Sequence, residues 1–260
     1  VRGQLRYWYR AILGAQGLPL NRVWEGESGL FGSTGAQSAV SVRVYCQLAE
    51  TPDVPMLPHR ANPAQRGPRP AIPENTAFSL ELASRPGTAI PPQALSTLRL
   101  WLLLGGIGKR SRRGFGALAC DKLIRPSTTV DDLVTTVRDR VANLVGPTAP
   151  GVIQMPAFPT LHPAHSRVVV CQAGYPTYTE AMRALFHQVL RVIPFLDRPE
   201  LGRAIGGRRA SPMHAQLRKA GNQYHWVLTI MHSNATGQAG WNWALYNDLY
   251  TKATTEGFAP

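Results

Sequence analysis

The sequence predicts an α+β protein made of two tandem units, and three observations support that prediction. The 260-residue chain contains 24 Gly and 22 Pro residues, which indicates many short connections rather than a helical bundle. Patterns in residues 1–126 follow the order helix, strand, strand, helix, strand, which is a β-α-β-β-α-β unit without its first strand. Residues 127–260 contain patterns of the same kind, so we expect a second domain of similar construction.

Hydrophobic periodicity defines the elements of the first unit. Residues 1–14 carry an apolar stripe at helical spacing, which ends in a glycine. Apolar and polar side chains alternate in residues 38–48 and 76–84, as they do in half-buried strands. Prolines begin a leucine-rich helix over residues 91–104 and glycines follow its end, while residues 117–124 predict a short strand.

The second unit begins after Arg125-Pro126-Ser127. Its patterns predict a helix, a strand, a second helix, a strand hairpin and a last helix. Proline-rich connections occupy residues 49–74 and 146–165, and the first is long enough to predict a functional or mobile loop. The expected elements lie at residues 129–144, 167–172, 177–193, 211–218 with 224–232, and 239–253.

Composition limits the classes of partner and location. The chain has 28 Lys and Arg residues against 15 Asp and Glu, a net charge of +13, which favours a polyanion such as nucleic acid as the partner. No apolar run approaches the ~18 residues of a membrane-spanning helix, and the chain does not open with a secretory signal. Three widely separated cysteines predict reduced thiols in the cytoplasm, and no metal or cofactor is expected.

Residues 105–116 form a loop with five glycines and four cations. Glycines allow left-handed backbone and close approach of a ligand, and successive N–H groups beside cations bind phosphates. Phe115, held between two glycines, is a candidate to stack on a base. The alternative is a solvated basic turn without a ligand. The nucleic-acid-binding candidates of this loop are Gly106, Gly108, Lys109, Arg110, Ser111, Arg112, Arg113, Gly114 and Phe115.

The spacing of residues in this loop excludes two common nucleotide-binding motifs. A Walker A loop needs a glycine where Leu103 stands and Ser or Thr where Arg110 stands. A dinucleotide fingerprint needs a preceding strand and a glycine where Ser111 stands. A polymeric phosphate backbone therefore suits the loop better than ATP or NAD.

Two further basic regions are candidates. The opening helix carries arginines at four-residue spacing, with no acidic residue before Glu25 to pair with them along the helix. A later glycine-rich turn lies in a stretch without acidic residues that also holds Arg203, Arg218 and Lys219. Without a ligand, the opening helix would simply have a solvated basic face, and the later segment would be a flexible surface turn. The binding candidates of these regions are Arg2, Arg6, Arg10, Arg208 and Arg209.

Histidines provide the remaining catalytic candidates. None of the seven lies in a metal-binding pattern such as H-E-x-x-H, and we expect each to be a surface or core residue. We therefore assign no catalytic residue. A metal-independent ribonuclease would need one of them near the glycine-rich loop as a general acid or base.

The order of motifs is similar to that of the RAMP superfamily of CRISPR effector proteins. The resemblance rests on VRGQLRYWYR at residues 1–10, ESGLFG at 27–32 and GGIGKRSRRGFG at 105–116, with RASP at 209–212 followed by YHWVLT at 224–229. The opening helix and the LFG motif are most similar to the first-numbered subunits of type III-B Cmr complexes.

The resemblance implies two tandem ferredoxin-like domains akin to RNA-recognition motifs, over residues 1–126 and 127–260, the first without its first strand. It implies a non-catalytic subunit near the 3′ end of a CRISPR guide RNA, which binds guide RNA and target RNA and contacts other RAMP subunits. Two alternatives remain open: a metal-independent RAMP-type endoribonuclease that processes CRISPR RNA, and a generic basic RNA-binding scaffold.

Overall fold

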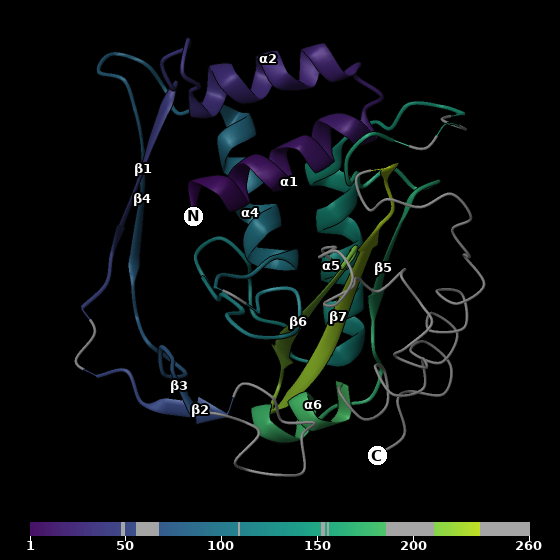
Figure 1. The fold of residues 1–260 in the computed structure, drawn as a ribbon. Coiled ribbons are helices and arrows are strands. Elements are labelled where there is room, and N and C mark those ends of the chain that lie inside the picture. Colours follow the sequence, from purple (N-terminus) through teal and green to yellow (C-terminus); the bar gives the residue numbers. More distant parts are fainter. Residues whose placement is uncertain are drawn as a thin grey trace.

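The computed structural model describes residues 1–47, 50–55, 68–108, 110–151, 154, 156–185 and 211–234, and it has a mixed α/β fold with antiparallel sheets. Three helices, α1 (Arg2–Ala15), α4 (Pro92–Leu104) and α5 (Val130–Val145), pack beside one another against a three-stranded sheet (Figure 1). The order of strands in this sheet is β5-β7-β6. The predicted α+β class is therefore confirmed.

The three-stranded sheet has apolar side chains on both faces. Its strands are β5 (Ser166–Val170), β6 (Met213–Ala220) and β7 (Gln223–Met231), and alternate residues along each point to opposite sides. Val227 and Met231 join the core under α1, α4 and α5, whereas Trp226, Leu228 and Ile230 join a second core with α6 (Tyr178–Ala184). Both cores are therefore built around one sheet.

The first unit holds one helix that its periodicity does not predict. Helix α2 (Leu20–Phe31) follows α1 directly and buries Val23, Glu27, Leu30 and Phe31 against it. The expected helix over residues 1–14 is confirmed as α1, and the expected helix over 91–104 is confirmed as α4.

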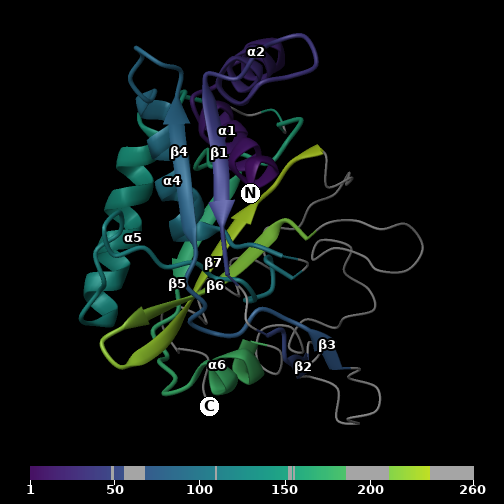
Figure 2. The same cartoon turned by 90° about the vertical axis from the view of Figure 1, so that its left-hand side faces the viewer.

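The predicted strands over residues 38–48 and 76–84 pair with each other in a separate hairpin. β1 (Val40–Tyr45) pairs antiparallel with β4 (Ser79–Ser84), and the hairpin runs along the outside of the helices (Figures 1 and 2). A second short pair, β2 (Asp53–Pro55) with β3 (Pro68–Pro70), lies within the long proline-rich connection.

The predicted strand over residues 117–124 is wrong. Only Ala117 makes a bridge, to Gly106, and the backbone N–H groups of Leu123 and Ile124 both donate to the carbonyl of Cys120. This turn lets Cys120, Leu123 and Ile124 all pack against the core, which a strand with alternating faces would not do.

The elements of the second unit largely follow prediction. Helix α5, strand β5 and the β6–β7 hairpin are confirmed, and Gly221 at the turn of the hairpin has φ +56°. Helix α6 begins where expected, but its predicted extension over residues 186–193 and the predicted helix over 239–253 lie outside the described residues. The boundary between residues 126 and 127 stays a prediction. Side chains from both sides of it, such as Trp101 and Val227, share one core.

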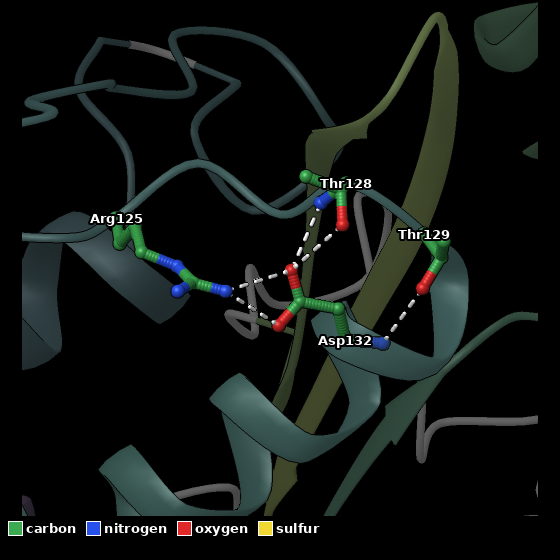
Figure 3. A network of polar contacts seen from close by, with 4 residues as sticks. All are labelled: Arg125, Thr128, Thr129 and Asp132. Atoms are coloured by element: carbon green, nitrogen blue, oxygen red, sulfur yellow. Dashed lines mark hydrogen bonds and ion pairs between the residues drawn. The ribbon is translucent and has the colours of Figure 1, made fainter.

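The start of α5 is fixed by a network around Asp132 (Figure 3). The hydroxyl of Thr129 accepts a hydrogen bond from the Asp132 backbone N–H at 3.1 Å, so Thr129 caps the helix. The Asp132 carboxylate accepts from the Thr128 backbone N–H at 2.9 Å and from Arg125 Nη2 at 3.3 Å. The pKa of Asp132 is lowered from its ordinary value, chiefly by the hydrogen bond from the Thr128 backbone.

We predict that this network makes stability depend on acidity. Because the pKa of Asp132 is lower in the folded chain than its unfolded value of about 3.9, the carboxylate stabilises the fold above that pH. The contribution is lost as pH falls through the folded pKa. Urea midpoints of wild type and Asp132→Asn should therefore differ at neutral pH and converge below about pH 4. A difference between the two urea midpoints that stays constant through this acid range would contradict the lowered pKa of Asp132.

Candidate nucleic-acid interface

The glycine-rich loop, residues 105–116, is closed at its base by backbone contacts. The Ile107 N–H donates to the Gly116 carbonyl at 2.9 Å, and Gly106 forms a bridge with Ala117. Gly116 has φ +67°, and a Cβ there would lie 1.9 Å from the Ile107 carbonyl oxygen. A glycine is therefore required at this position by the closure of the loop itself.

The second half of the loop lies along the edge of β6. The Ala215 N–H donates to the Arg112 carbonyl at 3.1 Å, and the Gly114 N–H donates to the Ala215 carbonyl at 2.8 Å. The Gln216 side-chain amide donates to the Ser111 carbonyl. A Cβ on Gly114 would lie 2.4 Å from the Trp226 ring, so this glycine serves protein packing.

Several predicted binding residues of the loop therefore have structural contacts. Ser111 and Gly114 are buried, and the Phe115 ring packs against the apolar core that contains Trp226. Gly106 is buried too, and a Cβ there would lie 2.9 Å from the Gln216 side chain. Binding by these four residues stays a prediction.

The described cations of the loop differ in their burial and in the contacts that hold them. Arg112 Nη1 donates to the Ser211 carbonyl at 2.6 Å, and the guanidinium lies 5.3 Å from the centre of the Tyr7 ring. Arg113 is half-buried, and burial lowers its pKa. Gly108 is exposed with φ +95° and open space beside its Cα, and Arg110 is partly exposed. Lys109 lies outside the described residues.

A hydrogen-bonded pair, the partly buried Tyr7 and the buried His214, lies beside Arg112. Tyr7 Oη and His214 Nε2 are hydrogen-bonded at 2.9 Å, and the His214 ring lies 5.2 Å from that of Trp8. Burial raises the pKa of Tyr7 to about 12. Burial, and then the nearby Arg112, lower the pKa of His214 well below its ordinary value. Both groups are therefore neutral at pH 7, and together they join α1, the loop and β6.

The motifs did not reveal Tyr7 and His214 as members of the site. They are separated by 207 positions in the chain, and although Tyr7 lies in the opening motif, nothing in that motif indicates a contact with His214. The only signal in the sequence was the position of Tyr7 between the arginines of the opening helix.

The arginines of α1 have different surroundings. Arg2 is exposed at the start of the helix, and the N-terminus lies beside the glycine-rich loop (Figures 1 and 2). Arg6 and Arg10 instead contact the buried Glu27 of α2, at 3.6 Å and 3.3 Å. As the sequence indicates, α1 itself holds no acidic partner for these arginines, but α2 brings the Glu27 carboxylate to them.

The Arg6 side chain also caps the C-terminus of helix α2. Its Nη2 donates to the carbonyls of Phe31, at 3.1 Å, and Gly32, which are among the last carbonyls of the helix. Burial raises the pKa of Glu27, and Arg10 and Arg6 only partly offset that effect. The ESGLFG motif at residues 27–32 thus supplies contacts that hold α1 against α2. RNA binding by Arg6 and Arg10 stays a prediction.

The third basic region is described only in part. Arg203, Arg208 and Arg209 lie outside the described residues. Arg218 caps the C-terminus of helix α4, because its guanidinium donates hydrogen bonds to the carbonyls of Leu102 and Leu103. Lys219 is exposed, with its Nζ 6.0 Å from the centre of the Tyr224 ring.

The histidines provide no metal site in the part of the chain that the structure describes, where no group of His, Cys, Asp or Glu side chains has suitable geometry. His162 and His165 are buried, and their rings lie 5.9 Å apart. His162 Nε2 is 2.7 Å from the Ala149 carbonyl, which fixes the connection that follows α5. No helix among the described residues has the length and apolarity to cross a bilayer.

Comparisons with known proteins agree with the resemblance of the motifs. Residues 1–119 match the family model of the RAMP superfamily. No curated protein matches the sequence.

Solved structures share the fold. The apo crystal structure of Cmr1 from Pyrococcus furiosus is 21% identical, with a TM-score of 0.54 over 93% of this chain and 80% of that chain. A chain of a cryo-EM structure of type III-B Cmr-beta bound to cognate target RNA is 11% identical, with a TM-score of 0.61 over 97% and 91%. A second Cmr-beta structure, bound to cognate target RNA and AMPPnP in the presence of ssDNA, is 10% identical, with a TM-score of 0.54 over 89% and 87%. The chain therefore resembles the RAMP superfamily in sequence over residues 1–119 and Cmr1 in fold over most of its length, as the motifs predict.

Proposed function

We propose that the chain is a non-catalytic RNA-binding subunit of a type III-B CRISPR (Cmr) effector complex, near the 3′ end of the guide RNA. The observation that carries the proposal is the corner where the start of α1 meets the glycine-rich loop. Arg2 is exposed at the start of α1, and in the loop Gly108 is exposed and Arg110 is partly exposed, in a chain of net charge +13. Cations beside an exposed glycine suit the phosphates of guide or guide–target RNA, whose backbone is the same for every sequence.

The partners follow from the comparisons. The Cmr-beta structures of similar fold are bound to cognate target RNA, which supports guide RNA, target RNA and other RAMP subunits as partners of this chain. Two tandem ferredoxin-like domains, over residues 1–126 and 127–260, are the domain organisation we propose. The placement of the paired strands β1 and β4 between helices α1 and α4 supports it, although α2 is an added helix and the strand expected over residues 117–124 is a turn.

The buried state of His214, a histidine beside the loop, supports a non-catalytic role. His214 is only 3% exposed, and its Nε2 is already hydrogen-bonded to Tyr7. A general base must reach the proton it accepts from the substrate, and this imidazole lies within the core. The pair therefore holds Arg112 in place rather than acting on a ribose hydroxyl.

Co-purification tests this function. The full chain, expressed with its neighbouring genes and purified through a tag, should carry a small RNA of fixed length. RNA of mixed length and origin would instead favour the generic scaffold. Incubation of the purified chain with CRISPR repeat RNA in EDTA should give no discrete cleavage product, and discrete cuts would favour the endoribonuclease.

A further inference from the structure

Arg112 in the glycine-rich loop is held at its backbone and at the end of its side chain. Its carbonyl accepts a hydrogen bond from the Ala215 N–H at 3.1 Å, on the edge of β6. Its Nη1 donates to the Ser211 carbonyl at 2.6 Å, and the guanidinium lies 5.3 Å from the centre of the Tyr7 ring. The residue is nevertheless only partly buried. Arg112 therefore has a fixed orientation while part of it stays open to solvent.

Three aromatic rings pack together on one side of this guanidinium. The Tyr7 ring lies 5.2 Å from that of His214 and 5.6 Å from that of Trp8, and Tyr7 Oη is hydrogen-bonded to His214 Nε2 at 2.9 Å. Trp8 and His214 are both buried. Because its neighbours belong to the close-packed interior, the Tyr7 ring offers a fixed face to Arg112, and such a face attracts a cation.

The charge of Arg112 is not neutralised by a carboxylate. Glu27 pairs with Arg6 and Arg10 of α1. Arg112 instead has no ion pair with any of the described residues, and Nη1 is the one nitrogen of its guanidinium with an acceptor among them. A guanidinium binds through two edges at once, because its five N–H groups form a planar fork. The edge that does not bind Ser211 is therefore available to an anion.

We propose that Arg112 bridges the protein and an RNA phosphate, and that Tyr7 is the positioning residue that orients it. The inference rests on the proposed function and deepens it, since it gives two residues of the RNA site different roles. RNA is favoured over a carboxylate of a partner protein because the same loop carries the exposed Gly108 and the partly exposed Arg110, in a chain of net charge +13. The Tyr7 ring contacts the guanidinium, so its loss should act through Arg112 alone.

The salt dependence of RNA binding tests both roles. Titrations of the full chain with single-stranded RNA, followed by fluorescence anisotropy over a range of salt, give the slope of log affinity against log salt. Arg112→Gln should lower the magnitude of this slope by roughly 0.7, the value of one phosphate contact. Tyr7→Leu should lower it by the same amount, and the double variant by no more than either. Tyr7→Phe should keep the wild-type slope, because a phenyl ring still attracts the guanidinium.

Two further variants complete the experiment. Arg138→Gln removes one exposed cation from α5 and should leave the slope unchanged. Arg112→Lys keeps the charge but should lower the slope as Arg112→Gln does, because one ammonium cannot bind the Ser211 carbonyl, the Tyr7 ring and a phosphate in the same arrangement. This variant leaves the core untouched, so it decides between positioning and charge alone if Tyr7→Leu unfolds.

The other possible results overturn one claim or the other. A wild-type slope for Arg112→Gln overturns the bridging role, and weaker association with other subunits in that variant would then identify a partner's carboxylate as the ligand. A wild-type slope for Arg112→Lys overturns the positioning role, as does a slope that Tyr7→Leu lowers further when Arg112 is already replaced. A lowered slope for Tyr7→Phe overturns it too. A wild-type chain without affinity for RNA overturns the proposed function, and this inference with it.

Discussion

Replacing Gly116 with alanine should lower the free energy of unfolding by about 2–5 kcal/mol, the sum of ~1–2 for left-handed backbone and ~1–3 for overpacking. Gly116 has φ +67°, and the new Cβ would lie 1.9 Å from the Ile107 carbonyl oxygen. That oxygen belongs to the backbone, so it cannot turn away as a side chain would. The hydrogen bond from Ile107 N–H to the Gly116 carbonyl, which closes the loop, should break. Urea unfolding followed by tryptophan fluorescence measures the change.

The control for this variant is Gly29→Ala. Gly29 lies within α2, and a Cβ there would meet no atom within 4 Å. Alanine in a helix is favoured over glycine by roughly 0.5–1 kcal/mol, so this variant should be slightly more stable than wild type. If Gly116→Ala were as stable as Gly29→Ala, glycine would not be needed to close the loop.

Replacing Arg218 with methionine should lower the free energy of unfolding by about 3 kcal/mol, because hydrogen bonds from a charged group are lost and their acceptors stay half-buried. Arg218 Nε donates to the Leu103 carbonyl at 2.9 Å, and Nη2 donates to the same carbonyl at 2.6 Å. Nη2 also donates to the carbonyl of Leu102. These carbonyls lie in the last turn of α4 and lack partners within the helix. Burial lowers the pKa of Arg218 to about 10, so the guanidinium stays charged at pH 7.

The adjacent cation provides the control. Lys219 is exposed, and its ammonium lies 6.0 Å from the centre of the Tyr224 ring. Lys219→Met should change the free energy of unfolding by about 0.5–1 kcal/mol at most, the value of an exposed cation–π contact. Thermal unfolding of the two variants side by side checks the difference. Equal destabilisation would show that Arg218 has no special role at the end of α4.

The regular elements were largely predictable because local patterns determine them. Apolar stripes identified α1, α4 and α5, and alternation identified both strand hairpins. Helix α2 was missed because its apolar residues divide between a buried side and the exposed Leu20 and Trp24, so no single stripe stands out. The false strand over residues 117–124 reflects the same limit, since apolar residues on a tight turn imitate a short strand.

The candidate site was predictable in its location but not in the roles of its residues. Glycines and cations marked residues 105–116, yet the contacts that hold Arg112 and Gly114 come from Ser211 and Ala215, about 100 positions away. The spacing of Arg6 and Arg10 implied a free cationic stripe, whereas Glu27 pairs with both from a helix that was not expected. Charge patterns within one helix therefore say little about partners that packing brings from another.

The central claim is that Lys109 and Arg110 of the glycine-rich loop bind the RNA backbone, and the salt dependence of binding tests it most directly. The double variant Lys109→Ala/Arg110→Ala is compared with Arg138→Ala/Arg140→Ala, which removes the same charge from the exposed side of α5. Anisotropy titrations with single-stranded RNA over a range of salt give the slope of log affinity against log salt. The loop variant should lower the magnitude of that slope by roughly 0.7 for each lost phosphate contact, while the α5 variant leaves it unchanged. A loop variant with the wild-type slope would contradict the assignment of this loop to RNA.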